Sequence, residues 1–292
     1  MIKINSENRI ERLVGPGGFP FVRLSHHSGY STTVSEYGGQ ILSWMSPEER
    51  EFLFVSSAAI YQNGKAIRGG IPVCFPQFGK GSLPQHGFAR TKRWSIVREH
   101  VSTTDAVSIT LRLTPDSAIE AVWPHRFVLE LDVVVTDVLL TALRVMNVGE
   151  ESFEFTAALH TYFRTSDIST ATLTGLRGIE YLDFLKDRAR FLEARSGISF
   201  VEPIDRAYSN SPDTLLLSSP ADGVRFRITK EGFQDSVVWN PWIEGNQAIT
   251  DLGPNEYRNM VCVESGNVLS PVTVEPRGVH ISGQVLRAEP SV

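Results

Sequence analysis

The sequence predicts an all-β fold, a sandwich or barrel of antiparallel strands. Apolar and β-branched residues alternate in many short runs that Gly, Pro, Asn or Asp interrupts, and this pattern is typical of such folds. Helical periodicity is scarce, and no alternation of strands with helices indicates a parallel sheet. The expected strands cover residues 31–36, 106–113, 127–136, 139–145, 153–163, 223–229, 236–239, 260–263 and 272–275.

The rest of the chain predicts few other regular elements and a single domain. Residues 183–194 are the best candidate for a helix, and the Gly-Pro-Gly-Gly sequence at 15–18 predicts a turn. At 292 residues the chain is within the size that one large β-sandwich can reach. No low-complexity linker, change of composition or fixed-period repeat divides it. We therefore expect one domain over residues 1–292.

Composition and charge exclude several classes of protein. Apolar residues make up 41% of the chain, enough for a sizeable core. The net charge of -5 is the opposite of what a protein needs to bind nucleic acid through its phosphates, so no nucleic-acid partner is expected. The first residues lack the apolar segment of a secretory signal, and no stretch approaches the roughly 18 apolar residues of a membrane span. We expect a cytoplasmic protein without membrane association.

The common metal, nucleotide and hydrolase motifs are missing from the sequence. The two cysteines, Cys74 and Cys262, lie far apart, which favours two reduced, buried thiols over a zinc site or a disulfide. Residues 79–82, Gly-Lys-Gly-Ser, resemble a phosphate-binding loop, but position 74 is Cys where that motif needs Gly, and position 81 is Gly where it needs Ser or Thr. His-Glu-x-x-His, Gly-x-Gly-x-x-Gly and Gly-x-Ser-x-Gly are also absent. No metal or other cofactor is expected.

Two arginines stand at the ends of one irregular segment. Residues 68–90 contain Arg68, Gln85, His86 and Arg90 and are too rich in Gly and Pro to form a regular element. A guanidinium matches the paired oxygens of a phosphate or carboxylate, so this segment predicts a local site for an anionic ligand.

A histidine and a glutamate in predicted strands are candidates for acid–base chemistry. Strand alternation places Ala158, His160 and Tyr162 on the face away from the more apolar side chains, and the small residue leaves room for a ligand. A single strand histidine is more often structural. Glu264 follows an apolar run, and a buried carboxylate there is either paired or functional. Together the two side chains could act as acid and base near neutral pH.

Two further residues could contact a sugar. Trp239, with Trp242, surrounds a polar turn and could form a wall of a sugar site, although core packing explains these indoles equally well. Asp205 could accept hydrogen bonds from ligand hydroxyls, although an aspartate in a loop usually caps a turn.

Five segments together closely resemble the glucose-6-phosphate 1-epimerases, or hexose-6-phosphate mutarotases, of the aldose 1-epimerase superfamily. The resemblance extends in order from about residue 20 to residue 285 and implies a galactose-mutarotase-like β-supersandwich without a cofactor. The matching segments are Arg-Gly-Gly-Ile-Pro-Val-Cys-Phe-Pro-Gln-Phe-Gly at 68–79, Leu-Pro-Gln-His-Gly-Phe-Ala-Arg at 83–90, Ala-Leu-His-Thr-Tyr-Phe-Arg at 158–164, Val-Trp-Asn-Pro at 238–241 and Val-Glu at 263–264. The first two are similar to this branch rather than to the galactose mutarotases.

The resemblance also implies an activity and roles for individual residues. The expected reaction interconverts the α and β anomers of hexose 6-phosphates, chiefly glucose 6-phosphate, and the expected protein is a monomer or a weak oligomer. His160 would protonate the ring oxygen as general acid, and Glu264 would take the C1 hydroxyl proton as general base. The resemblance implies ligand-binding roles for Arg68, Gln85, Arg90 and Asp205, of which the arginines would hold the 6-phosphate, and His86 would assist at the ring oxygen.

Two other functions remain open on the sequence. A non-catalytic sugar-phosphate-binding or regulatory protein would keep the arginines and tryptophans but would need no acid–base pair. A glycoside hydrolase or lyase would normally use two carboxylates that flank the scissile bond, and the matched motifs show no clear acidic companion for Glu264.

Overall fold

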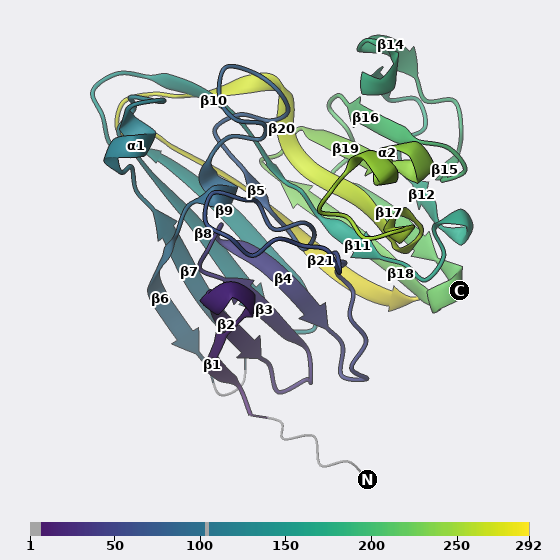
Figure 1. Cartoon of the computed structure of the whole chain (residues 1–292), viewed down its shortest axis with the longest axis horizontal. Coiled ribbons are helices and arrows are strands. Elements are labelled where there is room, and N and C mark those ends of the chain that lie inside the picture. The colour runs from purple at the N-terminus through teal and green to yellow at the C-terminus, as the bar shows by residue number, and fades with distance from the viewer. Residues whose placement is uncertain (1–6, 103–104, 292) are drawn as a thin grey trace.

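The computed structural model describes residues 7–102 and 105–291, and its strands form three antiparallel sheets (Figure 1). This confirms the predicted all-β fold. The described residues contain two short α-helices, α1 (Ser117–Glu120) and α2 (Trp242–Ala248). None of the helices in residues 7–102 and 105–291 has the length and apolar character needed to cross a membrane.

The sheets differ in size and strand order. The four-stranded sheet, β1-β2-β3-β4, contains β1 (Arg9–Val14), β2 (Pro20–Ser25), β3 (Ser31–Ser35) and β4 (Gln40–Met45). The eight-stranded sheet, β14-β13-β16-β19-β20-β10-β5 with β11 beside β20, contains β5 (Val73–Cys74), β10 (Phe153–Leu159), β11 (Tyr162–Arg164), β13 (Glu180–Asp183), β14 (Ala189–Leu192), β16 (Ile204–Tyr208), β19 (Asp235–Asn240) and β20 (Met260–Val274). The nine-stranded sheet, β15-β12-β17-β18-β21-β9-β8-β7-β6, contains β6 (Ser95–Val101), β7 (Val107–Leu113), β8 (Phe127–Val135), β9 (Leu139–Asn147), β12 (Thr172–Thr174), β15 (Gly197–Ser199), β17 (Thr214–Ser219), β18 (Val224–Glu231) and β21 (Val279–Pro290).

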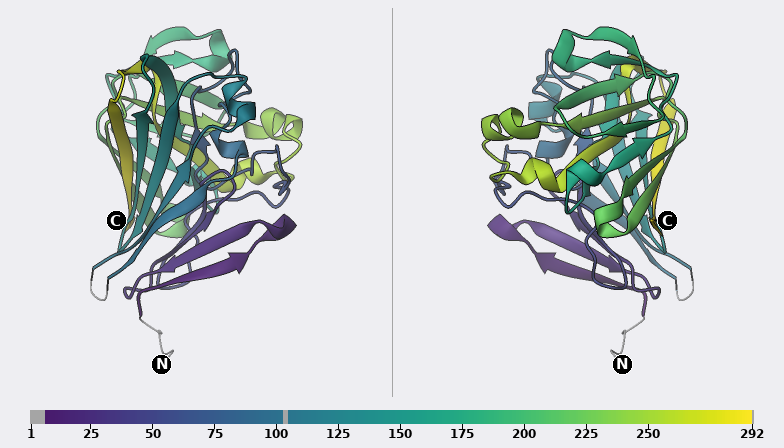
Figure 2. Two further views of the ribbon diagram at one scale, coloured as in Figure 1. Left: turned by 90° about the vertical axis from the view of Figure 1, so that its left-hand side faces the viewer. Right: turned by 90° about the vertical axis from the view of Figure 1, so that its right-hand side faces the viewer.

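Side-chain alternation along the strands separates the core from the outer face of the eight-stranded sheet. One cluster of buried apolar residues takes side chains from both large sheets, among them Leu143 of β9, Val238 of β19 and Val263 of β20. Successive residues of a strand point to opposite faces. Trp239, which follows Val238, and Glu264, which follows Val263, therefore point away from this core. Figure 2 shows helix α2 projecting at the side of the molecule opposite the C-terminal strand β21. The outer face of the eight-stranded sheet therefore carries side chains that are not part of this core.

The predicted helix at residues 183–194 is wrong. The segment is a hairpin: β13 ends at Asp183, a 3-10 turn covers Phe184–Lys186, and β14 starts at Ala189. Asp187 and Arg188 both have positive φ, at 49° and 60°, which ends any helix. Pairing of β13 with both β14 and β16 outweighs the local helical pattern.

Three strand predictions also need correction, although the remaining strands are found close to their expected positions. The predicted strand 153–163 is interrupted at His160 and Thr161, between β10 and β11. The two predicted strands 260–263 and 272–275 are one continuous strand, β20, so Glu264 lies inside a strand and does not close one. The predicted turn at 15–18 is confirmed as a 3-10 turn, Pro16–Gly18, between β1 and β2. Both cysteines are free and buried, as predicted.

Candidate active site

A cavity of about 510 Å³ lies on the outer face of the eight-stranded sheet. It brings together seven of the eight residues that the sequence singled out, from segments far apart in the chain. Arg90 is the exception, because it does not line the cavity. The lining residues are Arg68, Phe78, Gly79, Lys80, Gln85, His86, His160, Phe184, Arg188, Asp205, Val237, Trp239, Ile249, Glu264 and Val268.

Neighbouring strands form the floor of this cavity. Asp205 of β16 pairs with Trp239 of β19, and Val237 of β19 pairs with Glu264 of β20. His160 follows directly after β10, where its backbone N–H donates to the Pro72 carbonyl at 3.0 Å. The loop before β5 therefore satisfies the backbone N–H of His160 at the point where the strand is interrupted.

His160 and Glu264 form a buried pair at the floor of the cavity. His160 Nε2 lies 3.4 Å from Glu264 Oε1, and the residues are only 6% and 1% exposed. The remaining polar atoms, His160 Nδ1 and Glu264 Oε2, are buried without a hydrogen-bond partner. Buried polar atoms are nearly always satisfied, so two unsatisfied atoms on one pair indicate a functional pair and not a structural ion pair.

The surroundings of this pair oppose charge on both partners. Burial lowers the pKa of His160 well below its usual value, and the nearby His86, Arg90 and Arg68 lower it further. Burial raises the pKa of Glu264 well above its usual value, the Asp205 carboxylate adds to the increase, and Arg90 opposes it. Both shifts favour the neutral forms, an unprotonated His160 beside a protonated Glu264, so the pair holds one proton and titrates as a unit.

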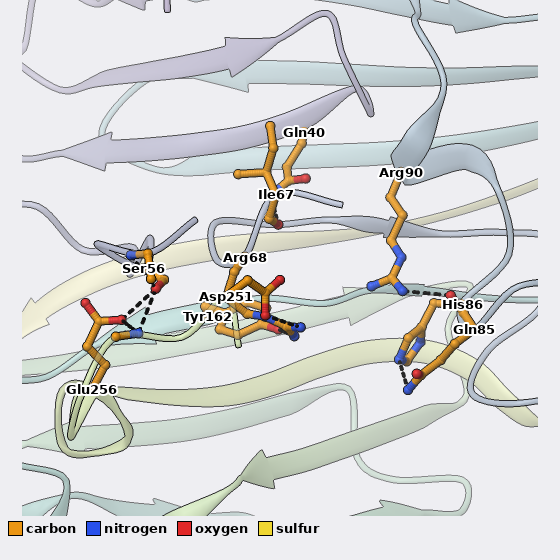
Figure 3. A network of polar contacts seen from close by, with 12 residues as sticks. Gln40, Ser56, Ile67, Arg68, Gln85, His86, Arg90, Tyr162, Asp251 and Glu256 are labelled. Atoms are coloured by element: carbon orange, nitrogen blue, oxygen red, sulfur yellow. Dashed lines mark hydrogen bonds and ion pairs between the residues drawn. The ribbon is translucent and has the colours of Figure 1, made fainter. Parts of the chain in front are cut away.

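Arg68 is fixed in the cavity wall by a carboxylate that the sequence did not indicate. Its Nε and Nη2 donate to Asp251 Oδ1 at 3.1 and 3.0 Å, and its Nη1 donates to the Tyr162 hydroxyl at 3.1 Å (Figure 3). Buried Gln40 holds the backbone on both sides of Arg68 through hydrogen bonds to the carbonyls of Ile67 and Gly69. The guanidinium is thus held in position before any ligand binds.

Arg90 does not line the cavity, but it contacts a residue that does. Its Nη2 donates to the Gln85 carbonyl at 2.7 Å, as Figure 3 shows, and its Nε is buried without a partner. Its positive charge contributes to the lowered pKa values of His86 and His160. Direct contact between Arg90 and a phosphate remains a prediction.

His86 stands on a strained loop beside the acid–base pair. Its backbone has a positive φ of 64°, and its ring lies 5.6 Å from the ring of His160. The next residue must be glycine, because Gly87 has a φ of 71° and a Cβ there would lie 2.1 Å from the Phe75 carbonyl oxygen. Burial, with the charges of Arg90 and Arg68, lowers the pKa of His86 to about 3. His86 is therefore neutral at physiological pH.

Asp205 is a second carboxylate in the same cavity as Glu264. The matched motifs did not indicate that the two carboxylates lie in one site. Burial and the Asp183 carboxylate raise the pKa of Asp205 to about 6. Trp239 stands beside it, with its ring 6.1 Å from that of His160 and 6.1 Å from that of Tyr162. An indole wall next to a hydrogen-bonding carboxylate suits a ligand with a hydroxylated, partly apolar ring.

Sequence reasoning missed two cations in the cavity lining, Lys80 and Arg188. Lys80 belongs to the segment rejected as a phosphate-binding loop, and Arg188 belongs to the segment predicted to be a helix. Both residues are exposed, and the Arg188 guanidinium lies over the Phe184 ring at 5.4 Å. Their positive charge was visible in the sequence, but only the folded hairpin β13–β14 brings Arg188 to the cavity.

Comparison with known proteins decides the family. A profile of the aldose 1-epimerase family matches residues 20–286. The chain belongs to the aldose 1-epimerase family. This confirms the resemblance derived from the sequence, and the family's members are isomerases, or mutarotases, that act on sugars. The site described above is therefore the candidate active site of an aldose 1-epimerase family protein.

Curated relatives and solved structures agree with membership of the aldose 1-epimerase family. A protein of Cenchrus ciliaris named "putative glucose-6-phosphate 1-epimerase" is 40% identical over 94% of this chain and 87% of its own length. An Escherichia coli K12 protein with the same name is 32% identical over 82% of this chain and 80% of its own length. The crystal structure of a Salmonella typhimurium "putative mutarotase" matches with a TM-score of 0.88 at 24% identity, covering 97% of each chain. Galactose 1-epimerase of Lactobacillus acidophilus matches with a TM-score of 0.74 at 14% identity, over 98% of this chain and 100% of the other, which confirms the galactose-mutarotase-like fold.

Proposed function

We propose that this aldose 1-epimerase family protein interconverts the α and β anomers of hexose 6-phosphates, chiefly glucose 6-phosphate. The observation that carries the proposal is the buried His160–Glu264 pair, which has unsatisfied polar atoms at the floor of a sugar-sized cavity. The curated relatives named for glucose 6-phosphate support the choice of substrate.

The reaction needs only one proton donor and one proton acceptor. The ring oxygen gains a proton while the C1 hydroxyl loses one, the bond between C1 and the ring oxygen breaks, and an aldehyde forms. Rotation about the bond between C1 and C2 followed by the reverse steps closes the ring on the other face of the carbonyl. A pair that shares one proton, such as His160 and Glu264, supplies both functions, and closure restores its starting state.

The charge of the substrate determines where the shared proton lies. In the empty cavity, burial and the charges of Arg90 and Arg68 oppose an imidazolium at His160, whereas burial and the Asp205 carboxylate favour a protonated Glu264, although Arg90 opposes it. A phosphate dianion bound near these arginines offsets their charge and favours transfer of the proton to His160. The bound state then contains the acid and base that the sequence predicts, His160 as acid and Glu264 as base.

The phosphate would be held by cations of the cavity wall. Arg68, Lys80 and Arg188 line the cavity, and Arg68 is already oriented by Asp251. Charge-assisted hydrogen bonds from these groups would fix the ring with its C1 end over the acid–base pair. Gln85, His86, Asp205 and Trp239 are then placed to contact the sugar itself.

Anomer exchange of glucose 6-phosphate and of glucose, followed by NMR exchange spectroscopy, tests the proposal. Wild type is expected to prefer the phosphorylated sugar. Arg68→Met should lower kcat/KM for glucose 6-phosphate by about 10- to 100-fold, since a hydrogen bond to a charged group contributes about 1.5–3 kcal/mol, and should affect glucose much less. Arg93→Met, which removes an exposed arginine paired with Glu36 outside the cavity, is the control. Equal activity of wild type on both sugars would remove phosphate recognition from the proposal.

The pH dependence of the reaction should report on the shared proton. Activity requires a singly protonated pair, so the rate should fall in acid, where His160 and Glu264 are both protonated, and in alkali, where both have lost the proton. The lowered pKa of His160 moves the acid limb below the usual histidine range, and the raised pKa of Glu264 moves the alkaline limb above the usual carboxylate range. We expect a broad bell-shaped profile of kcat/KM with a plateau through neutral pH. Glucose is the better substrate for this measurement because the phosphate itself titrates near pH 6.

A profile with a single limb near pH 6.5, the usual pKa of histidine, would contradict this account of the pair.

Incubation with oligosaccharides distinguishes the rival hydrolase, for which Asp205 and Glu264 would be the two carboxylates. Release of reducing ends without anomer exchange would favour that rival. A non-catalytic binding protein would bind glucose 6-phosphate and show neither activity.

A further inference from the structure

The Nδ1 atom of His86 lies beside two hydrogen-bond donors of its own chain. The backbone N–H of Gly79 donates to it at 3.3 Å, and the thiol of Cys74 lies 3.4 Å away. A backbone amide can only donate, so Nδ1 must accept and cannot carry a proton. Cys74 is fully buried, and burial raises the pKa of its thiol, so the thiol keeps its proton and also acts as a donor.

We infer that Cys74 and the Gly79 amide are positioning groups, which hold His86 as the Nε2–H tautomer so that it serves the reaction as a hydrogen-bond donor and not as a base. The inference rests on the proposed function for the reaction itself, but the tautomer of His86 does not depend on it. Nε2 is the ring nitrogen left to contact a ligand, because Nδ1 is occupied on the protein side and His86 lines the cavity.

The loop around His86 is tied together in a way that fixes these contacts. The backbone N–H of His86 donates to the Gly79 carbonyl at 2.9 Å, and this hydrogen bond closes the loop between the two residues. The Gln77 side-chain amide donates to the carbonyls of Gly79 and Leu83 and accepts from the Leu83 N–H. The ring of Phe78 packs edge-on against His86, with ring centres 4.9 Å apart. Such support explains how the strained backbone of His86 is maintained.

The same tautomer determines how Gln85 faces His86. The side-chain nitrogen of Gln85 lies 3.5 Å from His86 Nε2. In this orientation the donor group of Gln85 would face the N–H group of His86, and no hydrogen bond could form. A half-turn of the amide places its oxygen there instead, and Gln85 then accepts from His86. Gln85 is exposed, so a ligand oxygen can take its place as the acceptor for Nε2–H.

A neutral donor next to the acid–base pair has a clear use. Opening of the ring places new negative charge on a sugar oxygen at the moment of proton transfer, and a preorganised N–H group stabilises such charge without first having to reorganise. The His86 ring is 5.6 Å from that of His160, so the donor acts on the same end of the substrate. Because His86 is neutral, it also places no additional positive charge beside His160.

The tautomer can be measured directly. Two-dimensional ¹⁵N–¹H NMR of the labelled full-length protein distinguishes a protonated from an unprotonated ring nitrogen, and His86→Gln assigns the signals. We expect an unprotonated Nδ1 and a protonated Nε2, unchanged between about pH 5 and 8, the range in which ordinary histidines titrate. A protonated Nδ1, or conversion to the imidazolium within this range, would overturn the inference whatever the activity.

Two variants test the role of Cys74. Cys74→Ser keeps a donor, whereas Cys74→Ala removes it, so kcat should fall about two- to tenfold in the alanine variant, with KM little changed, and remain near wild type in the serine variant. The ¹⁵N signal of His86 Nδ1 should shift in Cys74→Ala and less in Cys74→Ser. Cys262→Ala, which removes the other buried thiol, on β20, is the matched control and should leave that signal unchanged.

The outcomes separate the inference from the proposed function. Alanine and serine variants with equal rates and equal Nδ1 signals would show that Cys74 only fills space, and would overturn its positioning role. Absence of anomer exchange in wild type, together with the expected tautomer, would overturn the proposed function and leave the tautomer established.

Discussion

Replacement of Glu264 by glutamine is expected to slow anomer exchange by about 10²- to 10⁴-fold, the usual contribution of a positioned acid–base group. Glutamine has the shape of glutamate but cannot take up or release a proton. It cannot share the proton of His160, whose Nε2 lies 3.4 Å from Glu264 Oε1. NMR exchange spectroscopy of glucose 6-phosphate measures the loss, with the uncatalysed rate subtracted.

The folded structure should tolerate this change. Glu264 is 1% exposed, and burial favours its protonated form, so a neutral amide of the same shape replaces a neutral carboxylic acid. The melting temperature is therefore expected to stay nearly the same. Glu154→Gln, at an exposed position of β10, is the control and should keep full activity. An active Glu264→Gln enzyme would show that Glu264 is not the base.

Replacement of His160 by alanine should cause a loss of similar size. His160 is the other half of the pair, and its removal leaves Glu264 without a partner for proton exchange. Because the two residues act as a unit, the double variant with Glu264→Gln should be scarcely slower than either single variant. Steady-state kinetics of all three proteins on glucose 6-phosphate measure this non-additivity.

Stability needs a separate measurement for His160→Ala, because the imidazole stacks on the Tyr162 ring at 4.7 Å. Circular dichroism would show whether the fold persists, and His27→Ala, at an exposed position, is the control for loss of a histidine. Losses that multiply in the double variant, rather than overlap, would refute the shared-proton pair.

Much of this site could be predicted because its chemistry lies in compact motifs on strands. Period-2 alternation places Ala158, His160 and Tyr162 on one face, and the structure puts His160 at the floor of the cavity. Other features could not be predicted, because they depend on segments that meet only in the folded chain. Asp251 reaches Arg68 from a position 183 residues away, and no local pattern indicates it.

The errors in the sequence analysis share a physical cause. Residues 183–194 contain enough helix-favouring side chains to indicate a helix, yet pairing to β16 makes them a hairpin. Residues 264–271 carry too few apolar side chains to indicate a strand, yet β20 continues through them, because residues 264–267 pair with β19 or β10 and pairing with β10 resumes at Val272. Sheet pairing is a long-range interaction, and it outweighs local preferences at both places.

The position of β20 and β21 has a consequence for the synthesis of the protein. β20 lies between β19 and β10 in one large sheet, and β21 lies between β18 and β9 in the other. Until residues 260–290 leave the ribosome, each sheet exists as two separate halves with unpaired edges, and the candidate active site lacks Glu264. Folding is therefore expected to be completed only after translation of these strands, and during that interval the nascent chain exposes strand edges that a chaperone would have to shield from aggregation.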